Sequence, residues 1–310
     1  MPIVSNKSMT IPMNLTTTTN KPSFRFSHAI TGHMGPIYAM VSDHNFVYTA
    51  SSDRFVTRWD PHTGQQDAFA VQTPAAAFSL AIVPTKNHLI LGLDNGKMHV
   101  IDLEIRQEIN HLNRHNAAVF SILANPTNGH LYSVDAAGML CVWDSNYQQL
   151  LQFPICDSKI RQVALAPDAK SLYLACGDGH LRAFDTEYFN PILDFQAHIN
   201  ACTALALDFQ GWLLTGGKDG YIRLWDLQGA KKASVPAHKG NIYQLVKLSD
   251  TCFASCSTDK SVKIWSLDSL TVLQKLEATR HADRRSINAL IQTDTYLMAA
   301  GDNKQILCYL

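Results

Sequence analysis

Short runs of alternating hydrophobic and polar residues cover most of this chain. The stretch 238–265, HKGNIYQLVKLSDTCFASCSTDKSVKIW, shows the pattern, with apolar runs separated by polar turns. Alternation with period two is typical of a β-strand whose two faces meet different surroundings. The 3.6-residue period of a long amphipathic helix occurs nowhere in the sequence. The sequence therefore predicts an all-β protein built from short strands.

The strand pattern recurs seven times. Each copy has a turn rich in Asp, Asn or Gly, then an alternating run, and the copies are 51–60, 93–102, 135–144, 176–185, 217–226, 257–266 and 301–310. Each run leads to one large residue, and these are Trp59, Ile101, Trp143, Phe184, Trp225, Trp265 and Tyr309, spaced 40 to 44 positions apart. Four short strands fit into one such repeat. A sheet of that size buries its faces only by stacking on its neighbours.

A histidine marks the start of five repeats, 26 to 28 positions before the large residue: His33, His115, His198, His238 and His281. Trp-Asp pairs stand at 59–60, 143–144 and 225–226, and Gly32 precedes the first histidine. These features resemble the WD40-repeat family over residues 24–310, and compact single-domain members, bacterial ones included, are the most similar in kind. The resemblance implies a seven-bladed β-propeller.

The resemblance also implies how the ring closes. The seventh repeat reaches only its third strand at Leu310, and the segment 24–30 precedes the first repeat without a blade of its own. We expect 24–30 to form the outer strand of the last blade, since closure removes an exposed strand edge. The expected organisation is a flexible N-terminal tail over residues 1–22 and a propeller over 23–310.

In WD40 repeats an Asp, the His, a Ser or Thr and the Trp form a buried hydrogen-bonded set. The resemblance implies such sets in blades one, five and six, with Asp53, His33 and Trp59, with Asp219, His198 and Trp225, and with Asp259, His238 and Trp265. Blade three has Ala137 where the Asp is expected, and blades two and four lack the histidine. We expect these three blades to be less rigid, because an incomplete network loses cooperativity.

Composition indicates which class of partner and which cellular compartment to expect. Charged residues are 17% of the chain, and 26 Lys and Arg balance 26 Asp and Glu, whereas a nucleic-acid binder needs uncompensated cations. The sequence has no signal-peptide pattern at its start and no apolar run long enough to span a membrane. Its seven cysteines are scattered, without a CxxC pair. We expect a cytoplasmic protein with reduced thiols and no membrane partner.

Motifs for catalysis and metal binding are missing from the sequence. The patterns G-x-S-x-G, H-E-x-x-H and C-x-x-C and the calcium loop are absent. His111 and His115 are spaced like metal ligands, but no third ligand accompanies them and His115 is already a repeat marker. The expected protein is not an enzyme and uses no cofactor or metal.

WD40 propellers have a narrow central channel, and the resemblance identifies the residues that point to its mouth. They follow the first apolar residue of each innermost strand and are Tyr38, Phe120, Arg161, Thr203, Tyr243 and Asn288, with Phe78 or Ser79 in the second blade. Three aromatic residues and an arginine at one opening have the composition of a binding hot spot. The alternative is that the rings only fill the channel.

The densest basic cluster in the sequence is 279–286, TRHADRRS, which leads into the last blade. On the same face as Arg161 and Lys239, Arg284 and Arg285 would complete a cationic arc. Guanidinium groups bind carboxylate and phosphate in bidentate fashion. An acidic or phosphorylated peptide is therefore the expected ligand, and the alternative is an ordinary solvated loop.

The leading hypothesis is a non-enzymatic scaffold, a monomer, that docks protein or peptide partners on its loop faces. The expected partner-binding residues are Tyr38, Phe120, Arg161, Tyr243, Arg284 and Arg285. One alternative is a propeller that binds a small ligand or conceals an enzyme, which would need a dry pocket with convergent polar groups. A second is a nucleic-acid-associated module, which steep salt dependence would reveal.

Overall fold

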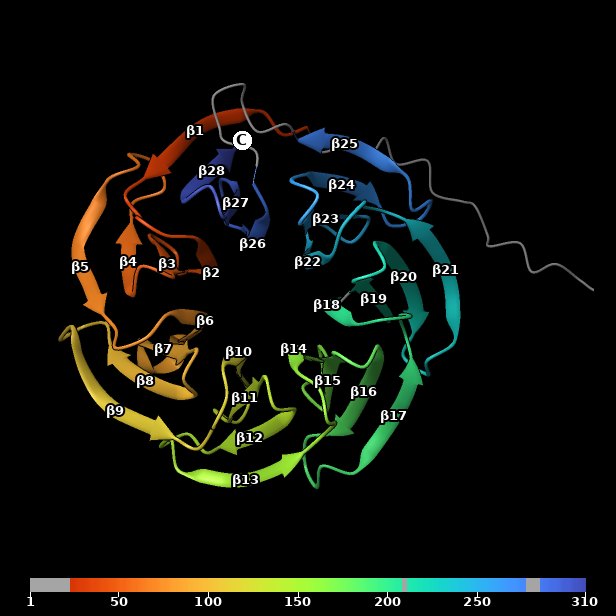
Figure 1. Ribbon diagram of the computed structural model, residues 1–310, viewed down its shortest axis with the longest axis horizontal. Helices are drawn as coiled ribbons and strands as arrows, with labels where there is room; N and C mark the ends of the chain where they lie inside the picture. Colours follow the sequence, from red (N-terminus) through yellow and green to blue (C-terminus); the bar gives the residue numbers. More distant parts are fainter. Residues whose placement is uncertain (1–22, 208–210, 277–284) are drawn as a thin grey trace, which may run out of the picture.

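The computed structural model describes residues 23–207, 211–276 and 285–310, whose strands form seven four-stranded antiparallel sheets. The sheets are blades around a central axis, and each blade has one strand at the centre and one at the rim (Figure 1). The 3-10 turn η1 (Pro84–Lys86) is the only helical segment of the described residues. The predicted all-β, seven-bladed propeller is confirmed, while the predicted tail at 1–22 lies outside the described residues.

In each of the first six blades the strands follow in chain order from the centre outward. Blade 1 contains β2 (Ile37–Ser42), β3 (Val47–Ser51), β4 (Phe55–Trp59) and β5 (Gln66–Gln72). Blade 2 contains β6 (Ala77–Val83), β7 (His88–Leu93), β8 (Lys97–Asp102) and β9 (Gln107–Asn113). Blade 3 contains β10 (Val119–Ala124), β11 (Leu131–Asp135), β12 (Met139–Trp143) and β13 (Gln149–Pro154).

The second half of the ring repeats this arrangement. Blade 4 contains β14 (Ile160–Leu165), β15 (Ser171–Cys176), β16 (His180–Asp185) and β17 (Pro191–Gln196). Blade 5 contains β18 (Cys202–Ala206), β19 (Trp212–Gly217), β20 (Tyr221–Asp226) and β21 (Lys231–Pro236). Blade 6 contains β22 (Ile242–Lys247), β23 (Cys252–Ser257), β24 (Val262–Ser266) and β25 (Val272–Leu276). Blade 7 contains β26 (Ile287–Gln292), β27 (Leu297–Gly301), β28 (Gln305–Tyr309) and β1 (Phe26–Thr31).

The ring is closed by pairing of its first and last strands. β1 runs antiparallel to β28, with Ile30 opposite Ile306. Just beyond the two strands, the main chains of Arg25 and Leu310 exchange hydrogen bonds of 2.7 and 2.9 Å. The predicted closure by the N-terminal strand is confirmed. Because β1 covers the outer edge of β28, blade 7 has the same four strands as its neighbours.

The core lies in layers between neighbouring blades. The second strand of a blade is typically buried along its whole length, as in β3, β11 and β27. Both faces of such a strand are covered, one by the preceding blade and one by the following blade. Trp59, for example, is 2% exposed and shares a cluster with Met298 and Ile306 of blade 7. The large residue of each repeat therefore belongs to the packing between blades.

A β-bulge interrupts every innermost strand at its second residue. The register of the pair β2–β3 shifts between Ile37 and Ala39, and the other six blades shift at the equivalent position. A bulge leaves one residue out of the ladder and turns its side chain away from the regular alternation. The seven bulge residues are Tyr38, Phe78, Phe120, Arg161, Thr203, Tyr243 and Asn288.

Candidate functional site

Buried hydrogen-bonded sets support the loops that lead into the innermost strands, a side we call the mouth face. In blade 1, Nδ1 of His33 lies 2.8 Å from Asp53 and Nε2 lies 2.7 Å from Oγ1 of Thr49. The same Oγ1 accepts the indole N–H of Trp59 at 2.7 Å. Blades 5 and 6 repeat this arrangement with His198, Asp219, Thr215 and Trp225, and with His238, Asp259, Ser255 and Trp265. The predicted sets in these three blades are confirmed.

The prediction that blade 3 lacks its acid was wrong. Oδ2 of Asp135, the last residue of β11, lies 2.8 Å from Nδ1 of His115. Nε2 of His115 lies 2.7 Å from Oγ of Ser133, which accepts the indole N–H of Trp143 at 2.9 Å. Both side chains of the His–Asp pair are fully buried. The acid stands two residues before Ala137, and from there its side chain reaches the same histidine nitrogen.

Blades 2 and 4 have other residues at the histidine position, four before the innermost strand. In blade 2 this residue is Thr73, whose hydroxyl donates to the main-chain oxygen of Ala75 at 2.7 Å. In blade 4 it is Cys156. A hydrogen bond with the Cys176 thiol, supported by Ser158, lowers the pKa of Cys156 to about 6 against the effect of burial. The lower rigidity expected of these blades stays a prediction.

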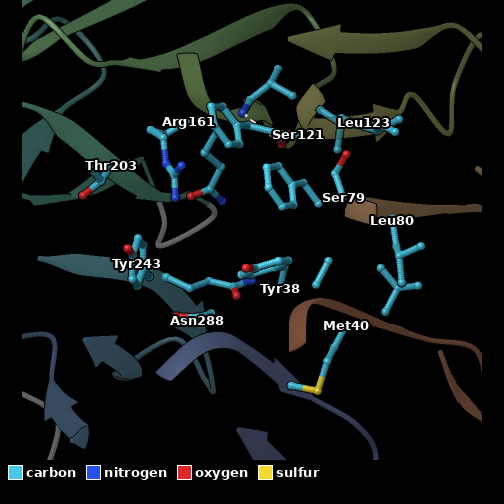
Figure 2. Close-up of a pocket in the computed structure, with 18 of the residues that line it drawn as sticks. Tyr38, Met40, Ser79, Leu80, Ser121, Leu123, Arg161, Thr203, Tyr243 and Asn288 are labelled. Atoms are coloured by element: carbon cyan, nitrogen blue, oxygen red, sulfur yellow. Dashed lines mark hydrogen bonds between the residues drawn. The ribbon is translucent and has the colours of Figure 1, made fainter. Parts of the chain in front are cut away.

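The seven bulge side chains converge on a central cavity of about 470 Å³ (Figure 2). The structure brings all six residues that the sequence places at the mouth to this one cavity. In blade 2 both candidates, Phe78 and Ser79, line it, and Phe78 holds the bulge position. A bulge at the same step of seven strands explains why side chains far apart in the sequence reach one opening.

Aromatic contacts join the bulge residues of blades 1 to 4 and continue to blade 6. The ring centroids of Tyr38 and Phe78 lie 4.8 Å apart at 86°, and those of Phe78 and Phe120 lie 5.8 Å apart at 5°. Cζ of Arg161 lies 4.3 Å from the ring centroid of Phe120 and 5.4 Å from that of Tyr243. Edge-to-face, stacked and cation–π geometries are all favourable, so these side chains hold one another in place.

Comparison with known families agrees with the repeat and the fold. The family model described as "WD domain, G-beta repeat" matches residues 24–60, 189–226 and 229–266. These segments contain the complete sets of blades 1, 5 and 6, and the strands between them continue the same seven-fold ring. The chain is a WD40-repeat protein.

Several named proteins are similar to this WD40 propeller. Target of rapamycin complex subunit wat1 from Schizosaccharomyces pombe is 28% identical over 48% of this chain and 48% of its own. Kinesin-like protein KIF21B from Mus musculus is 24% identical over 79% of this chain and 14% of its own. Autophagy-related protein 16 from Arabidopsis thaliana is 20% identical over 81% and 51%. The chain spans about half the length of these relatives or less.

Arg161 is the one cation among the seven bulge residues. No other described residue forms a hydrogen bond or an ion pair with its guanidinium. Its contacts are the two aromatic rings. Burial in the cavity wall lowers the pKa of the guanidinium. The pKa of Lys159 is also lowered, by burial and by the charges of Arg161 and Lys218. These three cations form the basic side of the mouth, over blades 4 and 5.

The mouth is acidic over blades 7 and 2, across the ring from that side (Figure 1). Asp302 follows β27, and its Oδ1 accepts a hydrogen bond of 2.8 Å from Nδ2 of Asn288. Burial raises the pKa of the Tyr38 hydroxyl, and the negative charges of Asp302 and Asp94 raise it further. Neither aspartate was among the predicted site residues, because each stands in a loop outside the innermost strands.

Thr203 and Asn288 line the mouth, but their polar groups are used within the propeller. The Thr203 hydroxyl donates to the main-chain oxygen of Ile242 at 2.6 Å. Nδ2 of Asn288 donates to the main-chain oxygen of Ile37 at 3.2 Å. Each bond joins the innermost strands of two neighbouring blades. The two side chains therefore join neighbouring blades of the ring.

The predicted cationic arc falls partly outside the described residues. Arg284 and most of the basic cluster 279–286 are among the residues that are not described. Arg285 is described and exposed, next to Ser286 of the cavity lining. Lys239 is exposed on the loop of blade 6, where its main-chain N–H donates to Asp259 at 3.0 Å. The arc stays a prediction.

Within residues 23–207, 211–276 and 285–310, no three His, Cys, Asp or Glu side chains are grouped as metal ligands. His111 stacks on His99 with ring centroids 4.7 Å apart, while His115 belongs to the set of blade 3. The same residues contain no helix of the length and apolarity needed to cross a membrane.

Proposed function

We propose that this WD40 propeller is a non-enzymatic docking platform that binds a segment of a protein partner across its mouth face. The observation that carries the proposal is the convergence of seven bulge side chains on one cavity. The binding residues are Tyr38, Phe120, Arg161 and Tyr243 in the cavity and Arg285 beside its lining, together with Arg284, which lies outside the described residues. Aromatic residues and arginine are the side chains that dominate the free energy of protein binding.

Preorganisation gives the platform its affinity. The cavity side chains are already in contact through the pairs Tyr38–Phe78, Phe78–Phe120 and Phe120–Arg161. A partner therefore loses little free energy to ordering these side chains. One relative, wat1, is named as a subunit of a complex, and this name supports a role in protein assembly here.

The basic side of the mouth favours an acidic or phosphorylated segment. Lys159, Arg161 and Lys218 would attract such a segment to blades 4 and 5. Equal numbers of acidic and basic residues in the whole chain disfavour nucleic acid as the partner. The propeller would act as a monomer. All seven cysteines are unpaired, which fits a reducing compartment such as the cytoplasm.

Affinity capture from a cell extract, followed by mass spectrometry, tests the proposal. The mouth variant carries Tyr38→Ala, Tyr243→Ala, Arg284→Glu and Arg285→Glu. The matched control carries His44→Ala and Asp294→Ala, two exposed residues that line a hollow on the opposite face. A partner kept by the wild type and the control but lost by the mouth variant supports docking at the mouth. If only the control loses the partner, the binding site lies on the opposite face.

A propeller that captures nothing in this experiment would contradict the docking proposal. Both variants must retain the wild-type melting temperature, because an unfolded variant loses partners for a trivial reason. Tyr38 and Tyr243 are half-buried, and Tyr243 packs against the layer between blades 6 and 7, so the melting temperature of the mouth variant is the necessary check of its fold.

A further inference from the structure

We propose that Arg161 binds one carboxylate of an Asp or Glu side chain on the docked segment, inside the central cavity. The inference rests on the proposed docking function and names the group that the cavity receives. A guanidinium has five N–H donors, and the other described residues supply no acceptor to those of Arg161. A partly buried cation without an acceptor raises the free energy of the empty site, which an anionic ligand lowers on binding.

The surroundings of Arg161 restrict how a ligand can approach it. Cζ stands over the rings of Phe120 and Tyr243, at 4.3 and 5.4 Å from their centroids. The two rings block approach on their own sides, and the N–H donors lie in the plane of the guanidinium. We therefore expect the ligand to bind at an N–H edge from the side of the cavity, which Arg161 lines (Figure 2). Two coplanar carboxylate oxygens fit this edge through a pair of parallel hydrogen bonds.

Charge balance favours a carboxylate over a phosphate. Arg161 is the one cation lining the cavity among the described residues, and it compensates one negative charge. A phosphoryl group carries about two negative charges at neutral pH, and the cost of removing an ion from water rises steeply with its charge. Asp94 and Asp302 on the acidic side would also repel a dianion more strongly than a monoanion.

The shape of the site favours a side chain carried by a longer segment. A cavity of about 470 Å³ is larger than a single carboxylate group needs. The rings of Tyr38, Phe78 and Phe120 line the remaining space and would contact the methylene groups of an acidic side chain. Lys159 and Lys218, which are exposed on the rim, would attract the segment to this side before the carboxylate enters.

Nuclear magnetic resonance on the full chain tests this inference with three capped amino acids. The probes are the N-acetyl, N-methylamide derivatives of glutamate, glutamine and O-phosphoserine. The reporter is the Nε–Hε signal of Arg161, assigned by its absence in Arg161→Lys. We expect a saturable shift with the glutamate probe, no shift with the glutamine probe and weaker binding of the phosphoserine probe. In Arg161→Gln, where the main-chain amide signal of the cavity residue Gln162 serves as the reporter, the affinity for the glutamate probe should fall about tenfold or more.

Arg114→Gln is the matched control, because it removes the charge of an exposed arginine that does not line the cavity and should retain the glutamate probe. No saturable shift with glutamate, an equal shift with glutamine, or tighter binding of phosphoserine would each overturn the inference. Its failure is distinguishable from failure of docking. If Arg161→Gln still captures the partner that the mouth variant loses, docking stands and the carboxylate site is refuted. If the glutamate probe binds but no protein is captured, the docking proposal alone is refuted.

Discussion

Oδ2 of Asp135 lies 2.8 Å from Nδ1 of His115, and neither side chain of this pair has any exposed surface. In blade 1 the equivalent acid is Asp53, which lies in the turn between β3 and β4, and its side chain is 12% exposed. Two different positions in the repeat thus satisfy the same histidine nitrogen. The pair in blade 3 is the more deeply buried of the two, and this difference has a measurable consequence.

Replacing Asp135 by Asn should destabilise the propeller more than the same change at Asp53. Both oxygens of Asp135 accept hydrogen bonds, one from His115 and the other from the main-chain N–H groups of Ala137 and Met139. Asn has only one acceptor oxygen, so at least one buried donor loses its partner, at a cost of about 1–3 kcal/mol. Solvent near Asp53 reduces that cost. Urea unfolding of Asp135→Asn and Asp53→Asn measures both. Equal losses in the two variants would show that the burial difference has no energetic effect.

Cys156 should be the most reactive thiol of the chain. Its pKa is lowered to about 6 by the hydrogen bond with Cys176 and by Ser158, while burial raises the pKa of Cys141, Cys256 and Cys308 to about 12. The thiolate is the reactive form, so iodoacetamide should label Cys156 at a rate that levels off above about pH 7. Peptide mass spectrometry identifies the labelled residue.

Two variants control the alkylation experiment. Cys156→Ser should remove the fast phase of labelling. Cys176→Ala removes the neighbouring thiol that lowers the pKa of Cys156 and should move the rate profile of Cys156 to higher pH. A profile that continues to rise toward pH 9 in the wild type, as an ordinary thiol does, would refute the assigned hydrogen bond.

The sequence predicts the architecture because the repeat period and the histidine markers are local features. Counting from His33, or from His238, to the first apolar residue of the innermost strand, and then one residue further, locates the bulge residue of that blade without any knowledge of the neighbours. Blade 2 has Thr73 at the marker position, so the count could not separate Phe78 from Ser79. The ladder register separates them, since only Phe78 is the bulge residue.

Other properties of the site depend on contacts between distant segments. The isolation of Arg161 from any acid among the described residues, and the position of Asp302 across the mouth, follow from the closed ring and not from nearby sequence. The repeat pattern expects the acid at the turn position of Ala137, whereas the hydrogen bond to His115 requires only a carboxylate within reach, which Asp135 supplies from the end of β11. The interaction between the thiols of Cys156 and Cys176 has no sequence motif that could predict it.

The stability of the propeller should fall as the pH drops below about 6.5, the value of an unfolded histidine. Burial lowers the pKa of His198 and of His238, although Asp219 and Asp259 partly oppose this effect. The unfolded chain therefore binds more protons than the folded chain in this window, and acid favours unfolding. Above that pH the contribution is fully present. Urea midpoints that stay constant from about pH 7.5 to 5.5 would contradict the prediction, and His198→Gln should reduce the slope.

The closing strand can be tested through Ile30, which is 2% exposed in β1 and packs in one cluster with Ile37 and Met298. Truncation to Ala leaves a cavity in the layer between blades 7 and 1 and should cost about 2–5 kcal/mol in urea unfolding. Ile192→Ala is the matched control, because Ile192 lies on the outer strand of blade 4 and is 47% exposed. The free energy of unfolding of Ile192→Ala should lie within about 0.5 kcal/mol of that of the wild type. If the two variants are equally stable, β1 contributes no more to the ring than an exposed strand position, and closure does not stabilise the propeller.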